Sequence, residues 1–183
     1  FWRNHKLNPA VTNFNVSVYA DSPDGYYEDG TPHQDRVYSV YQEGVYLGYK
    51  YTESRYFDYV EAAHNAGNFI YSDAVSYPFG HGLSYTSFEY SDYQVKTVGT
   101  GKEKKYIVSV DVKNTGSVAG KDVIQVYLNR PFGKYNEENG VEAPAAELVG
   151  FTKTELLNPG EEKEYSVEIS ERQFASYDAN KEK

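Results

Sequence analysis

The 183-residue sequence contains no cysteine and no methionine, and it has a single tryptophan. Without cysteine there is no disulfide framework and no thiol chemistry, so the cysteine count indicates no compartment. A chain that begins with Phe1 and lacks methionine indicates an internal fragment or a processed product. No apolar run approaches the roughly 20 residues of a membrane span, and no signal peptide is predicted. The sequence therefore predicts no membrane partner and leaves localisation unassigned.

Basic charge is also scarce. The chain has 18 Lys and Arg against 27 Asp and Glu, which gives a formal net charge of −9. This acidic balance argues against nucleic acid and anionic membranes as partners, because a chain with an excess of carboxylates neutralises phosphates poorly. Histidines 5, 33, 64 and 81 are scattered without metal-ligand spacing, and no glycine-rich phosphate loop is present. No metal and no cofactor are predicted.

What the chain has in excess is tyrosine, with 20 residues. Tyrosine combines an apolar ring with a polar tip, which suits half-buried sheets, interfaces and surfaces that face sugars. Trp2 and the tyrosines within residues 38–59 allow two interpretations. They pack against another domain, which we favour, or they stack on sugar rings.

The first 76 residues are predicted to be rich in loops. Turn signals crowd residues 1–35, and residues 61–76 have a loop-like composition. Between them, a 3-4-4 spacing of apolar side chains indicates one helix face, made by Tyr38, Tyr41, Val45 and Tyr49. Gly44 and Gly48 lie four apart, which would let that helix approach a neighbour closely. A short helix or strand is thus expected near 38–60.

Residues 77–90 have the composition of a rigid elbow. Pro78 fixes φ, while Gly80 and Gly82 permit backbone angles that other residues resist. The five aromatic residues of this segment can pin the resulting turn onto a surface beneath it. Residues 77–87 are therefore predicted to link two folded bodies.

From about Phe88 the pattern has period two, which is typical of strands with one buried face. Alternation is clearest in three segments, 106–112, 124–128 and 165–169, and a further strand is expected over 148–157. Turns are predicted at 99–101, 114–116 and 158–160. Short strands without intervening helical patterns predict an antiparallel β-sandwich. The polar loop 132–144 is expected to reach toward another domain.

Three segments resemble glycoside hydrolase family 3, of the β-glucosidase type. Residues 41–51, Tyr-Gln-Glu-Gly-Val-Tyr-Leu-Gly-Tyr-Lys-Tyr, are similar to the end of its α/β sandwich domain. The elbow 77–90 resembles the junction into its fibronectin III-like domain. Residues 112–127, 147–153 and 157–161 resemble that domain itself. The resemblance identifies residues 1–76 as the tail of an α/β sandwich domain, loop-rich and partly helical. It identifies residues 88–183 as an immunoglobulin/fibronectin III-like antiparallel sandwich.

The sequence departs from the family pattern after Asp178. The family usually continues into a final strand rich in glycine and β-branched residues, whereas this chain ends in Asn180-Lys-Glu-Lys183. The resemblance implies that the sandwich lacks its last strand. We therefore expect an open sheet edge, or a sheet completed by another chain, because unpaired edges recruit further strands.

The catalytic pair is also missing. Retaining glycosidases need two carboxylates about 5–5.5 Å apart, and the resemblance implies a nucleophilic Asp in a barrel domain and an acid/base Glu in the α/β sandwich. Neither motif is found here, so no catalytic residue is predicted. Glu43 is a weak candidate for substrate binding, with a buried structural carboxylate as the alternative. Ser84 and His81 lack a nucleophile-elbow pattern and are read as structural.

The leading interpretation is a non-catalytic structural portion of a family 3 enzyme that hydrolyses O-glycosyl bonds in carbohydrate metabolism. It is predicted to brace the catalytic domains and to be inactive alone. Its partners would be the remaining domains of the parent glycosidase, with self-association through an exposed sheet edge or an aromatic face. The alternative is a carbohydrate-binding or adhesion β-sandwich module; residues 41–51 speak against a purely adhesive domain.

Overall fold

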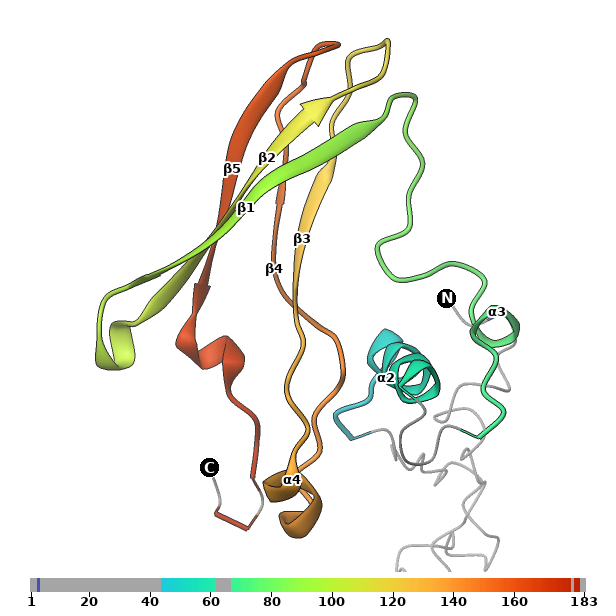
Figure 1. Ribbon diagram of the computed structural model, residues 1–183, viewed down its shortest axis with the longest axis vertical. Helices are drawn as coiled ribbons and strands as arrows, with labels where there is room; N and C mark the ends of the chain where they lie inside the picture. Colours follow the sequence, from blue (N-terminus) through green and yellow to red (C-terminus); the bar gives the residue numbers. More distant parts are fainter. Residues whose placement is uncertain (1–2, 4–43, 62–66, 179, 182–183) are drawn as a thin grey trace, which may run out of the picture. The chain divides into compact units, whose positions relative to one another are not determined.

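A computed structural model describes residues 3, 44–61, 67–178 and 180–181 (Figure 1). The chain divides into two compact units, Phe1–Phe79 and Gly80–Lys183. None of the helices in the described ranges is long and apolar enough to cross a membrane.

The first unit contains helix α2 (Tyr49–Val60) and the short helix α3 (Tyr71–Ala74). Gly44 and Gly48 precede α2 with φ of 54° and 62°, values that side-chain-bearing residues rarely adopt. These left-handed residues are incompatible with a continuous α-helix, so the helix face predicted from Val45 onward begins only at Tyr49. Tyr38 and Tyr41 lie outside the described residues.

Aromatic contacts hold α2 against the chain that follows it. The Tyr56 and Tyr71 rings meet edge to face, with centroids 5.2 Å apart. The Tyr71 hydroxyl donates to Glu53 Oε1 at 2.5 Å. Burial of the phenol and its bond to Glu53 raise the pKa of Tyr71 well above its ordinary value. Further along the same unit, Tyr49 stacks on Phe79 at 4.1 Å.

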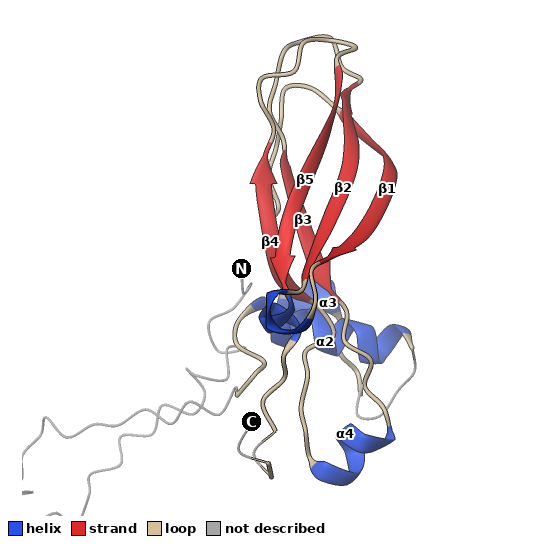
Figure 2. Cartoon of the chain, turned by 90° about the vertical axis from the view of Figure 1, so that its left-hand side faces the viewer, coloured by secondary structure: helices blue, strands red, loops and turns tan. Residues whose placement is uncertain are grey.

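The second unit is an antiparallel β-sandwich, which confirms the predicted fold class (Figure 2). Its strands are β1 (Phe88–Val98), β2 (Lys105–Asn114), β3 (Val123–Leu128), β4 (Glu147–Lys153) and β5 (Glu162–Ser170). One sheet has the order β1-β2-β5, and the other is the pair β3-β4. The described residues therefore form a three-stranded layer facing a two-stranded one.

The alternation of apolar and polar residues in β2 explains which of its side chains are buried in the core. Val108 and Val112 face the other sheet and are 8% and 0% exposed. Val108 lies opposite Val167 of β5 in the β2-β5 register. One core cluster joins Val108, Val149, Val167 and Ile169, and the other joins Val112, Ile124 and Leu157. Period two in the sequence thus predicts the buried face correctly.

The strand expected over 148–157 is shorter in the structure. β4 ends at Lys153, and Leu157 instead forms an isolated bridge with Gly120. The fully buried Leu157 is followed by the predicted turn, in which the Glu161 amide donates to Asn158 O at 2.9 Å. Gly160 has a φ of 79°, as the third position of a type II turn requires.

The loop 132–144 contains helix α4 (Lys134–Asn139) and folds against the C-terminal segment of its own unit. The Tyr135 hydroxyl donates to Asp178 Oδ2 at 2.6 Å. Nearby, the Arg130 guanidinium pairs with Glu147 and donates to the Gln173 and Ala175 carbonyls. After β5 the chain forms the 3-10 helix η3 (Glu171–Phe174), and no further strand is found among the described residues.

Candidate functional site

The structure describes only some of the candidate site residues that the sequence predicted. Glu43 and Trp2 lie outside the described residues. His81 and Ser84 are exposed, and Ser84 Oγ accepts the Thr86 amide at 3.3 Å, a local turn contact. Of the tyrosines within 38–59, Tyr49 and Tyr56 pack on other rings of the first unit.

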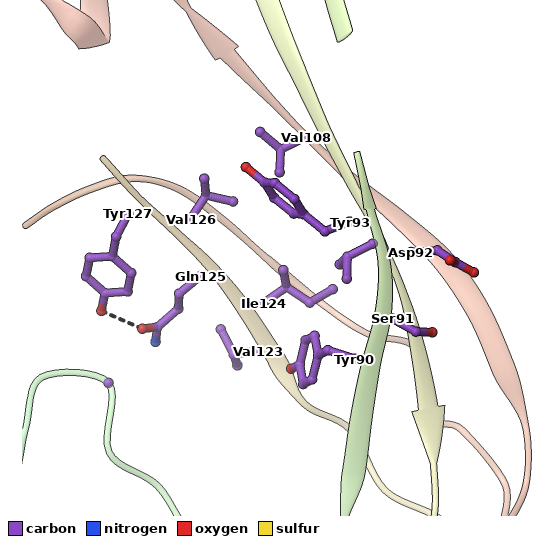
Figure 3. Close-up of a pocket in the computed structure, with 12 residues that line it drawn as sticks. Tyr90, Ser91, Asp92, Tyr93, Val108, Val123, Ile124, Gln125, Val126 and Tyr127 are labelled. Carbon is purple, nitrogen blue, oxygen red and sulfur yellow. Dashed lines mark hydrogen bonds between the residues drawn. The ribbon is translucent and has the colours of Figure 1, made fainter. Parts of the chain in front are cut away.

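A groove lies between β1 and β3 in the second unit (Figure 3). Its volume is about 760 Å³. The walls are residues 90–93 of β1, residues 123–127 of β3, Val108 and Val110 of β2, and Gly80 of the elbow. The groove therefore opens along the side of the sandwich where β1 has no strand opposite it.

A bulge in β1 shapes one wall. The pairing of β1 with β2 shifts by one residue between Ser91 and Gln94, and Asp92 there has a φ of 51°. The bulge turns Tyr90 and Tyr93 toward β3, whereas Ser91 and Asp92 project from the other side of β1 (Figure 3). Sequence reasoning missed this feature. Its signal was a break in the alternation, since the large side chains at 88, 90, 93 and 95 are spaced two, three and two apart.

The β1 wall is apolar but uncovered. Val95 lies directly opposite Val108 in the β1-β2 register, so both side chains are on the same face of the sheet. Val95 is nevertheless 50% exposed, against 8% for Val108. Tyr90 is likewise 44% exposed, although its register partner Val112 is fully buried. The second sheet therefore covers β2 more closely than it covers this part of β1.

The β3 wall is an uncharged edge. Its sequence, Val123-Ile-Gln-Val-Tyr-Leu128, has no Lys, Arg, Asp, Glu or Pro. The other strands all carry charged residues, from two in β4 to four in β5. Charges and bulges protect sheet edges against pairing with foreign strands. No described strand lies along the free side of β3, so this edge has no charged residue of its own to discourage pairing.

Two hydrogen bonds set the polar character of the groove. The Tyr90 hydroxyl donates to Asp122 Oδ2 at 2.7 Å. Burial of this phenol, together with its bond to Asp122, raises the pKa of Tyr90 well above the ordinary value. The Tyr127 hydroxyl donates to Gln125 Oε1 at 2.6 Å (Figure 3). Both phenols therefore donate hydrogen bonds to neighbouring side chains at the groove.

The groove does not have the arrangement that glycoside hydrolysis requires. Among the described lining residues Asp92 is the only carboxylate, and its side chain points away from β3 (Figure 3). A retaining mechanism needs two carboxylates about 5–5.5 Å apart on either side of the scissile bond. Within the described ranges, no group of three or more His, Cys, Asp or Glu residues suited to a metal ion is found. The groove combines an apolar wall, formed by β1, with the unpaired edge of β3.

Comparison with known proteins shows which proteins this chain resembles. A fibronectin type III-like domain family matches residues 122–183. A thermostable β-glucosidase B of Acetivibrio thermocellus is 38% identical over 143 residues, which are 78% of this chain and 16% of that protein. A β-glucosidase of Ruminococcus albus is 38% identical over 144 residues, 79% of this chain and 12% of that protein.

Solved structures agree. A β-glucosidase from Paenibacillus barengoltzii matches 97% of this chain and 15% of its own, with a TM-score of 0.67 and 32% identity. The GH3 β-glucosidase of Bifidobacterium adolescentis matches 94% of this chain and 19% of its own, with a TM-score of 0.59 and 28% identity. The chain belongs to glycoside hydrolase family 3.

Within family 3, the chain corresponds to the region that carries the fibronectin III-like domain. It spans only 12–17% of the length of the first three curated relatives. Most of the length of a family 3 enzyme therefore lies outside these residues.

Proposed function

We propose that this chain is a non-catalytic structural portion of a β-glucosidase-like family 3 enzyme, where it braces the domains that hydrolyse O-glycosyl bonds. The observation that carries the proposal is the groove between β1 and β3, which has an apolar wall and a free strand edge but no pair of carboxylates. A surface of this kind binds polypeptide better than it catalyses bond cleavage.

The proposed organisation has three parts. Residues 1–76 are the tail of an α/β sandwich domain, 77–87 the linker and 88–183 the fibronectin III-like domain. The partners are the remaining domains of the parent enzyme. The free edge of β3 is the place where another strand, from a second chain or from the rest of the parent, completes the smaller sheet. Isolated copies of the chain are then expected to associate weakly through this edge.

An activity assay tests the bracing role. The isolated chain is incubated with p-nitrophenyl β-glucoside, and the full-length parent enzyme is the positive control. We expect the isolated chain to release nitrophenol at the blank rate. Turnover above the blank would show that the chain carries its own catalytic groups.

A second assay separates bracing from sugar recognition. Tyr90, Tyr93 and Tyr127 line the groove, and aromatic rings can stack on sugars. Calorimetric titration of the chain with glucose and cellobiose is expected to give no binding heat. Saturable heat that disappears in a Tyr93→Ala variant would favour a carbohydrate-binding module instead.

A further inference from the structure

The last residues of the elbow lie against two glycines of the sandwich. A Cβ added to Gly116 would lie 2.1 Å from Thr86 Oγ1 and 2.8 Å from the Ser87 amide nitrogen. A Cβ on Gly120 would lie 2.6 Å from Thr86 Cγ2 and 3.3 Å from Phe88 Cζ. Such distances are shorter than van der Waals contact, so both positions require glycine while Thr86 is in place.

Asn114 connects this contact to the core. Its side chain is completely buried at the end of β2. Its Nδ2 donates to Val118 O at 2.8 Å and to Leu157 O at 2.9 Å. Its Oδ1 accepts the Thr86 hydroxyl at 2.6 Å and the Gly116 amide at 3.0 Å. Both donors and both acceptor positions of the amide are used, as a buried polar group requires.

The next residue adds backbone contacts. The Thr115 amide donates to Ser87 O at 2.8 Å, and Thr115 Oγ1 donates to the same oxygen at 3.2 Å. Two consecutive residues, Asn114 and Thr115, therefore form hydrogen bonds with the elbow at Thr86 and Ser87. Asn114 is buried, whereas Thr115 and Ser87 are exposed.

The elbow residues just before Thr86 are different. A Cβ on Gly82 would meet nothing within 4 Å. Leu83 is 94% exposed and Tyr85 is fully exposed. Gly82, Leu83 and Tyr85 therefore separate the tight contact at Thr86 from an earlier one at Gly80, where a Cβ would lie 2.4 Å from Gln125 Oε1.

We propose that Asn114 and Thr86 form a lock that makes residues 86–88 a fixed part of the sandwich, so that changes in the direction of the elbow are confined to residues before Thr86. Asn114 is a positioning residue in this arrangement, and its hydrogen bonds set where the chain enters β1. This inference rests on contacts within the second unit and does not depend on the bracing role.

Hydrogen exchange on the Thr86→Val variant is the first test. Valine keeps the shape of threonine but removes the donor to Asn114 Oδ1, at a typical cost equivalent to a five- to tenfold change in a local opening constant. The Thr115 and Gly116 amides are expected to exchange about five to ten times faster. The Asn114 amide, which is bonded to Glu161 O, should keep its rate.

The matched control is Thr100→Val, at the other end of β1, where the side chain makes no capping hydrogen bond to η2 (Gly101–Glu103). That variant should leave the Thr115 and Gly116 rates unchanged. Equal acceleration of every amide in Thr86→Val, or unchanged rates at Thr115 and Gly116, would overturn the lock.

A double-mutant cycle is the second test. Gly120→Ala should lower the melting temperature by about 4–8 °C, because its methyl group strikes Thr86 Cγ2. In a Thr86→Ala background that methyl finds room, and Gly120→Ala should cost at most half as much. Gly82→Ala, which enters open space, is the control and should leave the melting temperature unchanged. Equal losses in both backgrounds would show that Gly120 does not report on Thr86.

Discussion

Strands β1 and β2 are neighbours with similar apolar content, yet one is covered and the other is not. Val108 of β2 is 8% exposed, and its register partner Val95 of β1 is 50% exposed. Their side chains share a face of the same sheet. The difference comes from the opposite layer, which covers Val108 closely but leaves Val95 half exposed and a groove along residues 90–93 of β1. Burial here depends on how far the facing layer extends as well as on the sequence of the strand itself.

The largest effect is expected on the covered side, at Leu157. This side chain is completely buried in the cluster with Val112 and Ile124. Leu157→Ala should lower the free energy of unfolding by about 2–5 kcal/mol, because it removes buried methyl groups and leaves a cavity. Chemical denaturation measures this loss. Leu156→Ala, next in the chain and 55% exposed, is the control and should cost less than about 1 kcal/mol.

Substitutions of Val108 and its register partner Val95 test the difference in burial between β2 and β1 directly. Val108→Ala should cost about 1.5–2.5 kcal/mol, whereas Val95→Ala should cost below about 0.8 kcal/mol, since half of Val95 already faces water. Both values come from the same denaturation experiment. Equal costs would mean that β1 is covered in solution, as it would be if another strand occupied the groove.

A smaller effect is expected from a charge on the uncovered side. Val123→Lys places an ammonium group on the uncharged edge of β3, which should discourage pairing with another strand. Sedimentation velocity at increasing protein concentration should show less association than in the unchanged protein. Val118→Lys introduces the same charge at a similarly exposed position outside any strand. If both variants associate equally, the contact lies elsewhere than β3.

The smallest effect is expected outside both the covered and the uncovered parts of the sheet, where the C-terminal segment contacts α4. The hydrogen bond from Tyr135, aided by the Asn180 amide and Lys181, holds the pKa of Asp178 below its ordinary value. A lowered pKa means that this contact stabilises the fold fully above the unfolded pKa of about 3.9 and is lost as pH falls through the lower folded pKa.

Tyr135→Phe removes the principal donor, so the pKa of Asp178 should rise toward its ordinary value. An NMR titration of the Asp178 carboxyl carbon measures the midpoint. Tyr177→Phe is the control, because Tyr177 is 69% exposed and adjacent to Asp178 in sequence. An unchanged midpoint in Tyr135→Phe would show that Lys181 or the Asn180 amide dominates.

The comparison also shows how far sequence reasoning reaches. Alternation at 106–112 predicted the buried face of β2, because period two reports the face of a strand directly. The pattern in β1 did not predict that Val95 would be half exposed, because its burial depends on how the opposite sheet packs, and the residues of that sheet are distant in sequence. The spacing of Val45 and Tyr49 predicted a helix that includes Val45. The helix begins only at Tyr49, because Gly44 and Gly48 have left-handed backbone angles.

The groove and the lock were harder to predict for the same reason. Asn114 was read as part of a turn, which it is, but its four hydrogen bonds join residues 28 positions before it and 43 positions after it. Nothing in the local pattern distinguishes such an asparagine from one in a solvated turn. Only the spacing of large residues around Asp92 carried a readable signal of the bulge.

The strand order has a consequence for how the sandwich assembles. β1 and β2 are joined by a short connection, but β2 receives its second neighbour from β5, with Lys105 opposite Ser170. During synthesis, β3, α4 and β4 must all emerge before that pairing can form. Closing so long a loop is entropically slow. The β1-β2 hairpin is thus expected to exist for a time with both its edges free, which makes this interval of chain growth the one in which misassembly with neighbouring chains is easiest.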